Sequence, residues 1–211
     1  MPGRTRGKFI VLDGNEGSGK TTLIKVAREK YGDNLLLTRE IGGTPFAEEI
    51  RKQMFSSEGG KQADANTQFN LAWAARADHL KNVIKPALDQ GVNVLSDRFD
   101  SSTFAYQLYG QEARELEELF WIERKVVIGN YLPDLYILLD VIPENGVKRK
   151  GMQTDHVFDN YDNQPFDFYD RVREGYTDFL EKAPHKIIDA NQSLEKVQAE
   201  FLEILSDIIG S

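Results

Sequence analysis

The feature that most constrains this chain is a glycine-rich octapeptide near its N-terminus, Gly14–Thr21, which reads GNEGSGKT. It matches the pattern G-x-x-x-x-G-K-[S/T] and lies between an apolar run, Lys8–Asp13, and a stretch typical of a helix, Thr22–Lys30. A loop in this position turns backbone N–H groups inward around phosphate oxygens, and the helix that follows adds positive potential. The sequence therefore predicts an α/β fold that binds the phosphates of a nucleoside triphosphate.

Two side chains of this loop have predicted chemical roles. Lys20 is expected to reach the β and γ phosphate oxygens of ATP, and the Thr21 hydroxyl is expected to be a ligand for Mg²⁺. ATP is thus the predicted co-substrate, with Mg²⁺ as the metal ion. The ATP-binding residues predicted from this segment are Gly14, Asn15, Glu16, Gly17, Ser18, Gly19, Lys20, Thr21 and Thr22.

Apolar runs alternate with helix-like stretches along the rest of the chain, and this alternation predicts a doubly wound parallel sheet. One helix is expected over Thr67–Gln90, ended by Gly91, and another over Ser193–Ile209, with Ser193 as its N-cap. The length of 211 residues fits a single domain, 1–211. The expected strands after Lys8–Asp13 are Leu35–Leu37, Val92–Leu95, Leu135–Leu139 and Lys186–Ile188, which makes a five-stranded sheet flanked by helices.

One segment interrupts the alternation of strands and helices. Lys148–Asp167 is polar, weakly periodic and rich in Asp, Asn and aromatic residues. Polar segments of this length inside a compact domain are usually functional insertions. We interpret this stretch as a short mobile lid rather than a second domain.

Charge and composition limit the functional classes. The chain has 26 Lys and Arg against 34 Asp and Glu, a net charge of −8, which disfavours binding to a nucleic-acid backbone. It has no Cys, so disulfides and thiolate zinc sites are excluded. No apolar stretch near the N-terminus is long enough for a signal peptide or a membrane span. These features predict a cytoplasmic enzyme with neither nucleic acid nor membrane as a partner.

The residues after the expected strand Val92–Leu95 indicate what accepts the phosphoryl group. The run leads into Asp97-Arg98 rather than the paired acids typical of motor ATPases, and the N-K-x-D segment of GTPases is absent. At the carboxyl end of a parallel strand, Asp97 is expected to hold the Mg²⁺ shell. Arg98 is expected to bind a second phosphate in line with the first.

Five stretches stand out in order along the chain: Thr38–Pro45 with Ala47–Arg51, Ala74–Arg76, Asp97–Phe99 running on to Ala105–Gln107, Arg171–Tyr176 and Ile188–Ala190. Together they resemble the bacterial-type thymidylate kinases, and the likeness covers almost the whole chain. The resemblance implies the fold of P-loop nucleoside-monophosphate kinases and ATP-dependent phosphorylation of a pyrimidine deoxynucleotide, dTMP to dTDP, by a homodimer.

The resemblance also implies roles for single residues. Arg51 and Arg98 would hold the acceptor phosphate, and Arg76 and Thr103 would bind the pyrimidine edge. Tyr106 would crowd the ribose 2′ position and so favour a deoxyribose. Glu16 would reach the acceptor sugar hydroxyl, and Arg149 would stack on the adenine of ATP. The full predicted acceptor set is Glu16, Glu40, Arg51, Ala72, Arg76, Arg98, Thr103, Tyr106 and Gln107.

Two departures from the family pattern surround the base. Ile41 stands where the family has proline, and Ala72 stands where it has a phenylalanine that stacks on the pyrimidine. Loss of an aromatic face removes about 1–3 kcal/mol of stacking by analogy with base–aromatic contacts. Either Phe69 or Trp73 fills the gap, or the pocket accepts dUMP or a dUMP with a modified 5-position.

A third departure concerns the lid. Members with no arginine in the P-loop, as here with Asn15, generally supply lid arginines to neutralise the transferring phosphoryl group. The expected aspartate-arginine pair falls on Asp159-Asn160, so the arginine is missing. Lys150 is our candidate replacement. The predicted catalytic residues are Lys20, Asp97, Arg98 and Lys150.

Two other functions stay open at the level of sequence. A deoxynucleoside kinase would need a base to accept a 5′-hydroxyl proton and would have less use for two acceptor-site arginines. An inactive nucleotide-binding regulator would explain the missing lid arginine and the altered base pocket.

Overall fold

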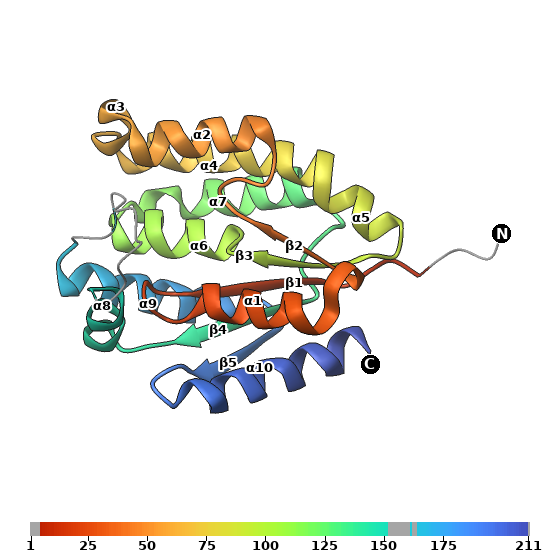
Figure 1. Ribbon diagram of the computed structural model, residues 1–211. Helices are drawn as coiled ribbons and strands as arrows, with labels where there is room; N and C mark the ends of the chain where they lie inside the picture. The colour runs from red at the N-terminus through yellow and green to blue at the C-terminus, as the bar shows by residue number, and fades with distance from the viewer. Residues whose placement is uncertain (1–4, 152–160, 162–163, 211) are drawn as a thin grey trace.

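The computed structural model describes residues 5–151, 161 and 164–210, in which five parallel strands form one sheet (Figure 1). The spatial order of the strands is β2-β3-β1-β4-β5, so the chain crosses over between neighbours as in other doubly wound sheets. Each strand lies within two residues of its predicted bounds. The strands are β1 (Phe9–Gly14), β2 (Leu35–Arg39), β3 (Asn93–Asp97), β4 (Leu135–Asp140) and β5 (His185–Asp189).

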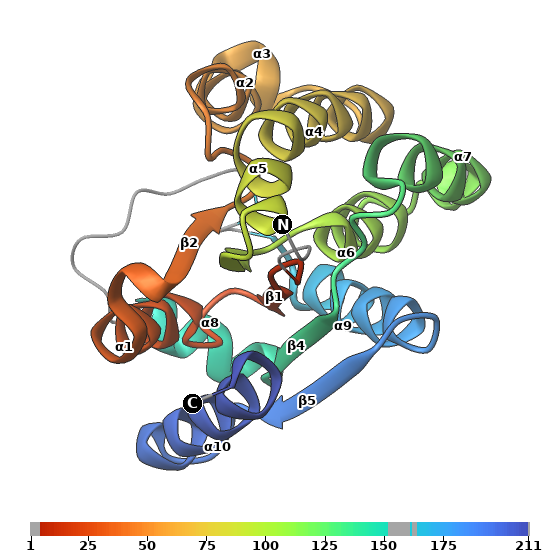
Figure 2. The same cartoon turned by 90° about the vertical axis from the view of Figure 1, so that its right-hand side faces the viewer.

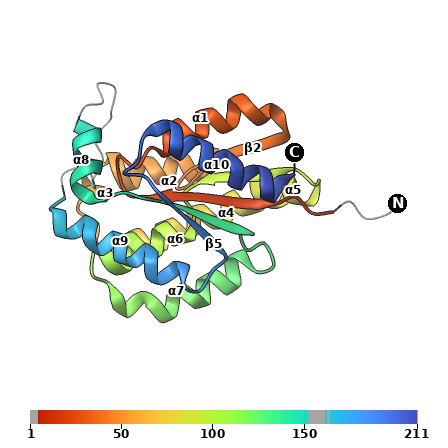
Figure 3. The same ribbon diagram turned by 90° about the horizontal axis from the view of Figure 1, so that it is seen from below.

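Helices cover both faces of the sheet. Figures 2 and 3 show α1 and α10 on one side, with α4, α6, α7 and α9 on the other. The α-helices are α1 (Lys20–Tyr31), α2 (Pro45–Ser56), α3 (Glu58–Lys61), α4 (Ala65–His79), α5 (Lys85–Asp89), α6 (Asp100–Thr103), α7 (Glu117–Glu123), α8 (Pro143–Gly151), α9 (Phe166–Leu180) and α10 (Leu194–Ile209). Short 3₁₀ segments are η1 (Gly32–Asn34) and η4 (Arg114–Leu116), and π-helical segments are η2 (Leu80–Ile84), η3 (Phe104–Gly110) and η5 (Arg124–Ile128).

The central strand β1 is apolar throughout because both of its faces are covered. Phe9 and Val11 point into the core shared with α4, η3 and α9, whereas Ile10 and Leu12 point into the core shared with α1 and α10. All four side chains are fully buried. Each such side chain contributes about 1.5–3 kcal/mol relative to an exposed one. This two-sided burial explains why the sequence shows a continuous apolar run instead of alternation.

The two predicted long helices are present, with differences in detail. The stretch predicted as Thr67–Gln90 forms α4, η2 and α5 in succession, so a π-helical turn interrupts the α-helix. Ser193 is the N-cap residue of α10, as predicted, but its side chain makes no capping hydrogen bond. No helix among the described residues is long and apolar enough to cross a membrane.

The predicted lid is more helical at its ends than expected. Helix α8 extends to Gly151 and α9 begins at Phe166, so both ends of the segment Lys148–Asp167 are helical. Pro143 lies in the first turn of α8, where its missing N–H costs nothing. The pair Asp159-Asn160 lies outside the described residues.

Candidate active site

The loop after β1 and the residues that end β3 lie side by side at the carboxyl edge of the sheet. Leu12 of β1 is opposite Asp97 of β3, and the backbone N–H of Arg98 donates to the Leu12 carbonyl at 3.0 Å. Ligands of open α/β sheets bind outside this edge. The fold therefore brings the phosphate-binding loop next to Asp97 and Arg98, which are far away in sequence.

Lys20 is buried and bound to its own loop. Its Nζ donates to the carbonyl oxygens of Gly14 at 2.9 Å and Asn15 at 3.1 Å, and lies 3.4 Å from the Ser18 hydroxyl. Burial, and then the charge of Arg98, lower the pKa of Lys20 to about 8. All of these hydrogen-bond partners are neutral, and a phosphate would both replace them and favour the charged form.

Gly17 fixes how the loop meets α8. Its φ of +69° is in the left-handed region, and a Cβ there would lie 2.0 Å from the carbonyl oxygen of Gly146. Both the conformation and the close approach exclude larger residues. This contact holds α8, which carries Arg149, directly against the loop.

A cavity of about 260 Å³ opens beside the loop, between α1, α8 and the start of α10. Arg149 donates from Nη1 to the carbonyl oxygen of Ala190 at 2.7 Å, which holds the guanidinium at the cavity wall. The cavity lies where the base of a nucleotide would extend from the phosphate loop. Its lining residues are Gly17, Ser18, Gly19, Thr22, Leu23, Arg149, Ala190, Gln192, Leu194 and Val197.

Asp97 and Thr21 are the predicted Mg²⁺ ligands. Asp97 Oδ1 is buried and has no hydrogen-bond partner among the described residues, and the Thr21 residue is exposed. By contrast, the nearby Asp13 carboxylate accepts from both Ser101 and Ser102. Burial raises the pKa of Asp13. A buried carboxylate oxygen without a partner among the described residues fits an oxygen-seeking cation such as Mg²⁺.

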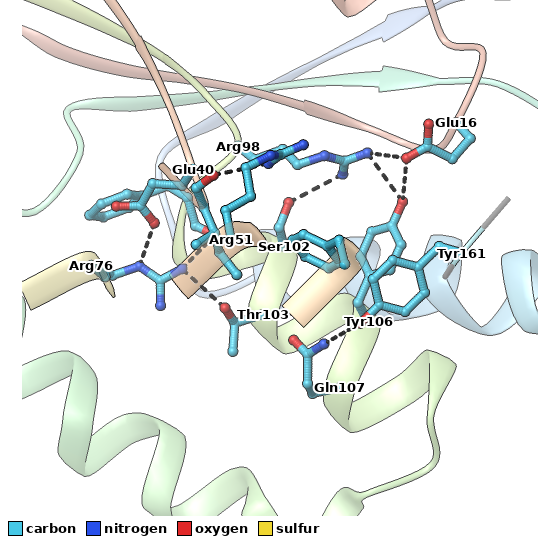
Figure 4. Close-up of a pocket in the computed structure, with 13 residues that line it drawn as sticks. Glu16, Glu40, Arg51, Arg76, Arg98, Ser102, Thr103, Tyr106, Gln107 and Tyr161 are labelled. Carbon is cyan, nitrogen blue, oxygen red and sulfur yellow. Dashed lines mark hydrogen bonds and ion pairs between the residues drawn. The ribbon is translucent and has the colours of Figure 1, made fainter. Parts of the chain in front are cut away.

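A second cavity, of about 80 Å³, has Arg98 in its wall (Figure 4). Its walls come from the P-loop, the segment after β2, and helices α2, α4, α6 and η3. Eight of the nine predicted acceptor residues line it. The lining residues are Glu16, Glu40, Ile41, Arg51, Phe55, Arg76, Arg98, Phe99, Ser102, Thr103, Tyr106, Gln107 and Tyr161.

Arg98 lies in the wall of the second cavity, next to the P-loop, in a strained backbone conformation with a φ of +70°. Its Nη2 donates to Glu16 Oε1 at 2.7 Å and to the Tyr106 hydroxyl at 3.2 Å, and its Nη1 donates to the Tyr176 hydroxyl at 2.8 Å. Burial lowers the pKa of Arg98, but Tyr106, Tyr176 and Glu16 raise it further, to well above its ordinary value. Arg98 is thus a permanent charge where the P-loop meets the second cavity.

A buried ion cluster forms one wall of the second cavity. Arg76 Nε donates to Glu40 Oε2 at 2.7 Å, and His79 Nδ1 lies 3.1 Å from Glu40 Oε1. Arg76 Nη2 donates to the Thr103 hydroxyl at 3.0 Å. Glu40 therefore orients Arg76. His79 was not foreseen, because its role is visible only when β2 and α4 are placed together.

Ala72, predicted as an acceptor residue, does not line the cavity. It is 1% exposed within α4, and its methyl group is too short to reach the cavity from one turn before Arg76. Neither Phe69 nor Trp73 lines the cavity, and both are packed in the main core. The aromatic walls are instead Phe55, Phe99, Tyr106 and Tyr161. Of these, Phe55, Phe99 and Tyr161 were missed by reasoning from the sequence alone.

Arg51 and Lys150 are the other two basic residues with predicted roles in phosphate binding or catalysis. Arg51 donates from Nη1 to the Ile41 carbonyl at 2.9 Å, and its guanidinium lies 5.3 Å from the centre of the Phe55 ring. Lys150 is part of α8, near the P-loop end of the molecule. Its catalytic role stays a prediction.

Comparison with known proteins agrees with this architecture. A model of the family described as thymidylate kinase matches residues 12–201. The chain belongs to the thymidylate kinase family. Two relatives named thymidylate kinase are those of Marinomonas sp. (strain MWYL1), 41% identical with 96% of each chain covered, and Hahella chejuensis (strain KCTC 2396), 37% identical with 95% of this chain and 97% of the relative covered.

A solved structure gives the same result for the fold of this thymidylate kinase family member. The crystal structure of thymidylate kinase from Ehrlichia chaffeensis has a TM-score of 0.70 and 31% sequence identity, and the match covers 95% of this chain and 99% of that one. The likeness therefore extends over the sheet and both cavities rather than over the P-loop alone.

Proposed function

We propose that this protein transfers the γ-phosphoryl group of ATP to dTMP, forming ADP and dTDP. The observation that carries the proposal is the position of Arg98, which lies between a phosphate-binding loop and a separate small cavity lined by two further arginines. Membership of the thymidylate kinase family supports the same activity. A cavity with three guanidinium groups suits an acceptor that already carries a phosphate.

The chemistry would be a direct in-line transfer. An oxygen of the dTMP phosphate attacks the γ-phosphorus of ATP, and the bond from that phosphorus to the β,γ-bridging oxygen breaks, which leaves ADP. No general base is required, because a phosphate monoester with a second pKa of about 6 is already ionised near neutral pH. Catalysis would come from positioning the two phosphates and neutralising their charge.

Each charged group would change partners when the substrates bind. Lys20 would exchange the carbonyl oxygens of Gly14 and Asn15 for the β and γ phosphate oxygens. Arg98, with Arg51, would bind the dTMP phosphate, in competition with Glu16. Glu16, released from Arg98, would then be available to the sugar hydroxyl.

The Asp97 carboxylate and the Thr21 hydroxyl are the proposed protein ligands of Mg²⁺. The orphaned oxygen of Asp97 supports this assignment. The ion would supply charge neutralisation on the phosphate oxygens of ATP when bound. Lys150 is proposed as the lid cation that replaces the missing arginine at Asn160.

Selection of the acceptor would follow from the walls of the small cavity. Arg76 and Thr103 would bind the pyrimidine edge, and the Tyr106 ring would exclude a ribose 2′-hydroxyl. Because apolar walls discriminate a methyl group by only about 1–3 kcal/mol, dUMP and 5-modified dUMP are expected as weaker acceptors. Purine nucleotides are expected to be rejected.

The family resemblance also supports a cytoplasmic homodimer packed through helices. Light scattering on the purified protein tests the assembly. A mass near twice that of the chain is expected, and a mass near 24.0 kDa would contradict it.

The experiment that tests the function is a turnover assay with ATP, Mg²⁺ and a panel of acceptors. We expect dTDP from dTMP, slower reaction with dUMP, and none with thymidine. Reaction with thymidine would indicate a deoxynucleoside kinase instead. ATP binding with no transfer to any acceptor would indicate an inactive regulator.

A further inference from the structure

Gln107 belongs to a buried chain of hydrogen bonds that leads away from the acceptor cavity. Gln107 Nε2 donates to the Tyr161 hydroxyl at 2.9 Å, and the Tyr161 hydroxyl donates to Gln68 Oε1. Gln68 Nε2 in turn donates to the backbone carbonyl of Ala63 at 3.1 Å. Gln107, Tyr161 and Gln68 are 4%, 7% and 2% exposed, so water does not compete for these groups.

The donor-to-acceptor direction of these hydrogen bonds is fixed at the Gln68 end. A backbone carbonyl can only accept, so the Gln68 amide must turn its nitrogen toward Ala63 and its oxygen toward Tyr161. The same oxygen also accepts from Gln111 Nε2 at 3.0 Å. Because the Tyr161 hydroxyl donates its single hydrogen to Gln68, its oxygen can only accept a hydrogen bond from Gln107. A flipped Gln107 amide would set two oxygens against each other.

The Tyr161 ring is held firmly enough to act in this way. It packs edge-on against Tyr106 at 4.9 Å between ring centres and stacks on Phe168 at 5.8 Å. Its backbone carbonyl accepts from the Tyr169 hydroxyl. The hydroxyl of Tyr161 is therefore a fixed point rather than a mobile contact.

The consequence is a defined pattern of donors and acceptors at the cavity wall. In Figure 4 the nitrogen of Gln107 turns toward Tyr161 and its oxygen turns away. No described residue donates to that oxygen. One helical turn earlier, the Thr103 hydroxyl accepts from Arg76, which leaves its own hydrogen for a ligand. The wall thus offers donors from Arg76 and Thr103 next to an acceptor from Gln107.

We propose that Tyr161, anchored by Gln68, is a positioning residue that holds the Gln107 amide with its oxygen toward the acceptor, and so selects a base that presents an N–H beside a carbonyl. Thymine and uracil have this imide edge, whereas cytosine presents an unprotonated ring nitrogen and an amino group at the same positions. The inference rests on the proposed function, since it assigns specificity within the same cavity.

The test is Tyr161→Phe, which keeps the ring and removes the hydroxyl. Without that hydroxyl the Gln107 amide can flip, so we expect the KM for dTMP to rise about tenfold and the preference for dTMP over dCMP in kcat/KM to fall about tenfold, as for loss of one buried hydrogen bond. The KM for ATP and the kcat at saturating dTMP should change less than about twofold. A merely structural role would damage all four quantities together.

A second variant and a control keep the test decisive. Gln68→Met should reproduce the loss of base preference, although Gln68 lies outside the acceptor cavity. If Tyr161→Phe does not fold, Gln68→Met alone tests the proposal. Tyr131→Phe removes a tyrosine hydroxyl that binds Asp89, away from the site, and should change nothing.

The outcomes also separate the inference from the proposed function. Unchanged preference for dTMP over dCMP in Tyr161→Phe and Gln68→Met, with wild-type protein active on dTMP, would overturn the inference alone. Wild-type protein that phosphorylates no pyrimidine deoxynucleotide would overturn both.

Discussion

The site predicted for ATP and the cavity predicted for the acceptor nucleotide are built in different ways. The phosphate-binding part of the ATP site depends on backbone groups of one continuous loop, Gly14–Thr21, although more distant residues such as Arg149 and Val197 line the cavity beside it. The acceptor cavity depends on side chains that range in sequence from Glu16 to Tyr161. A site made from backbone is thus encoded in a contiguous motif, whereas a site made from side chains is encoded in pairs that only the fold brings together.

The cations of the two cavities also have different partners. Lys20 has neutral partners, two carbonyl oxygens and a hydroxyl, and burial lowers its pKa. Arg98 and Arg76 each pair with a carboxylate, Glu16 and Glu40. The ATP site therefore gains charge compensation when its ligand binds, while the acceptor site exchanges one anion for another. Four experiments test this contrast.

The largest effect is expected for Lys20→Ala. The ammonium group contacts charge that develops on the phosphates, so kcat should fall by at least ~10²-fold, as for removal of one electrostatic donor. The melting temperature should hold or rise, because a buried charge is removed. Steady-state kinetics and thermal melting measure the two. Turnover close to that of wild type would contradict the assignment of Gly14–Thr21 as the ATP phosphate-binding loop.

Arg98→Ala should act mainly on the acceptor. Loss of a charge-assisted hydrogen bond worth about 1.5–3 kcal/mol should lower kcat/KM for dTMP by about 10- to 100-fold. The KM for ATP should change far less. Arg39→Ala, which removes an exposed ion pair with Glu48, is the control and should be near neutral. Equal damage to the KM of both substrates would contradict the separation of the two cavities.

The pH dependence should distinguish the cavities as well. The lowered pKa of Lys20, about 8, means that its charge is present below pH 8 and is lost above it. We expect kcat/KM for ATP to fall about fivefold between pH 8 and pH 9, from the fraction of charged lysine. Lys20→Arg, with a group that stays charged, should abolish this decline whatever its activity. A flat profile in wild type would show that Lys20 stays fully charged.

The smallest kinetic effect is expected for Ala72→Phe. Since Ala72 is buried away from the cavity, the added ring should overpack α4, at a cost of about 1–3 kcal/mol, without tightening dTMP binding. Thermal melting should show a loss of about 2–10 °C. The KM for dTMP should stay within about threefold of wild type. A markedly lower KM would mean that the ring does reach the base.

The sequence predicted the sheet, the P-loop and most of the acceptor wall for identifiable reasons. The apolar runs at the centre of the sheet became strands because both of their faces are buried, whereas in the edge strand β5 only Ile188 is buried. Residues at strand ends, such as Asp97, lie at the carboxyl edge by topology alone. The sequence could not predict His79 or Phe55, because their roles arise from contacts between separate helices and strands.

The misplacement of Ala72 has a related physical cause. Matching position 72 to the family pattern indicates which way its side chain points but not how far it reaches. The methyl group of Ala72 cannot fill the space of a phenyl ring. The aromatic surface of the cavity comes partly from Tyr161, in a segment whose sequence pattern is weakly periodic. Composition and periodicity give no information on which wall such a residue reaches.

The central claim is that Arg98 joins an ATP site to a site for a nucleoside monophosphate. The most direct measurement is product analysis after incubation of wild-type protein with ATP labelled in the γ-phosphate and dTMP. The account predicts label in dTDP, and a strong loss of that product with Arg98→Ala while ATP still binds. Label only in inorganic phosphate would contradict the account. So would label in dTMP when thymidine replaces dTMP in the incubation.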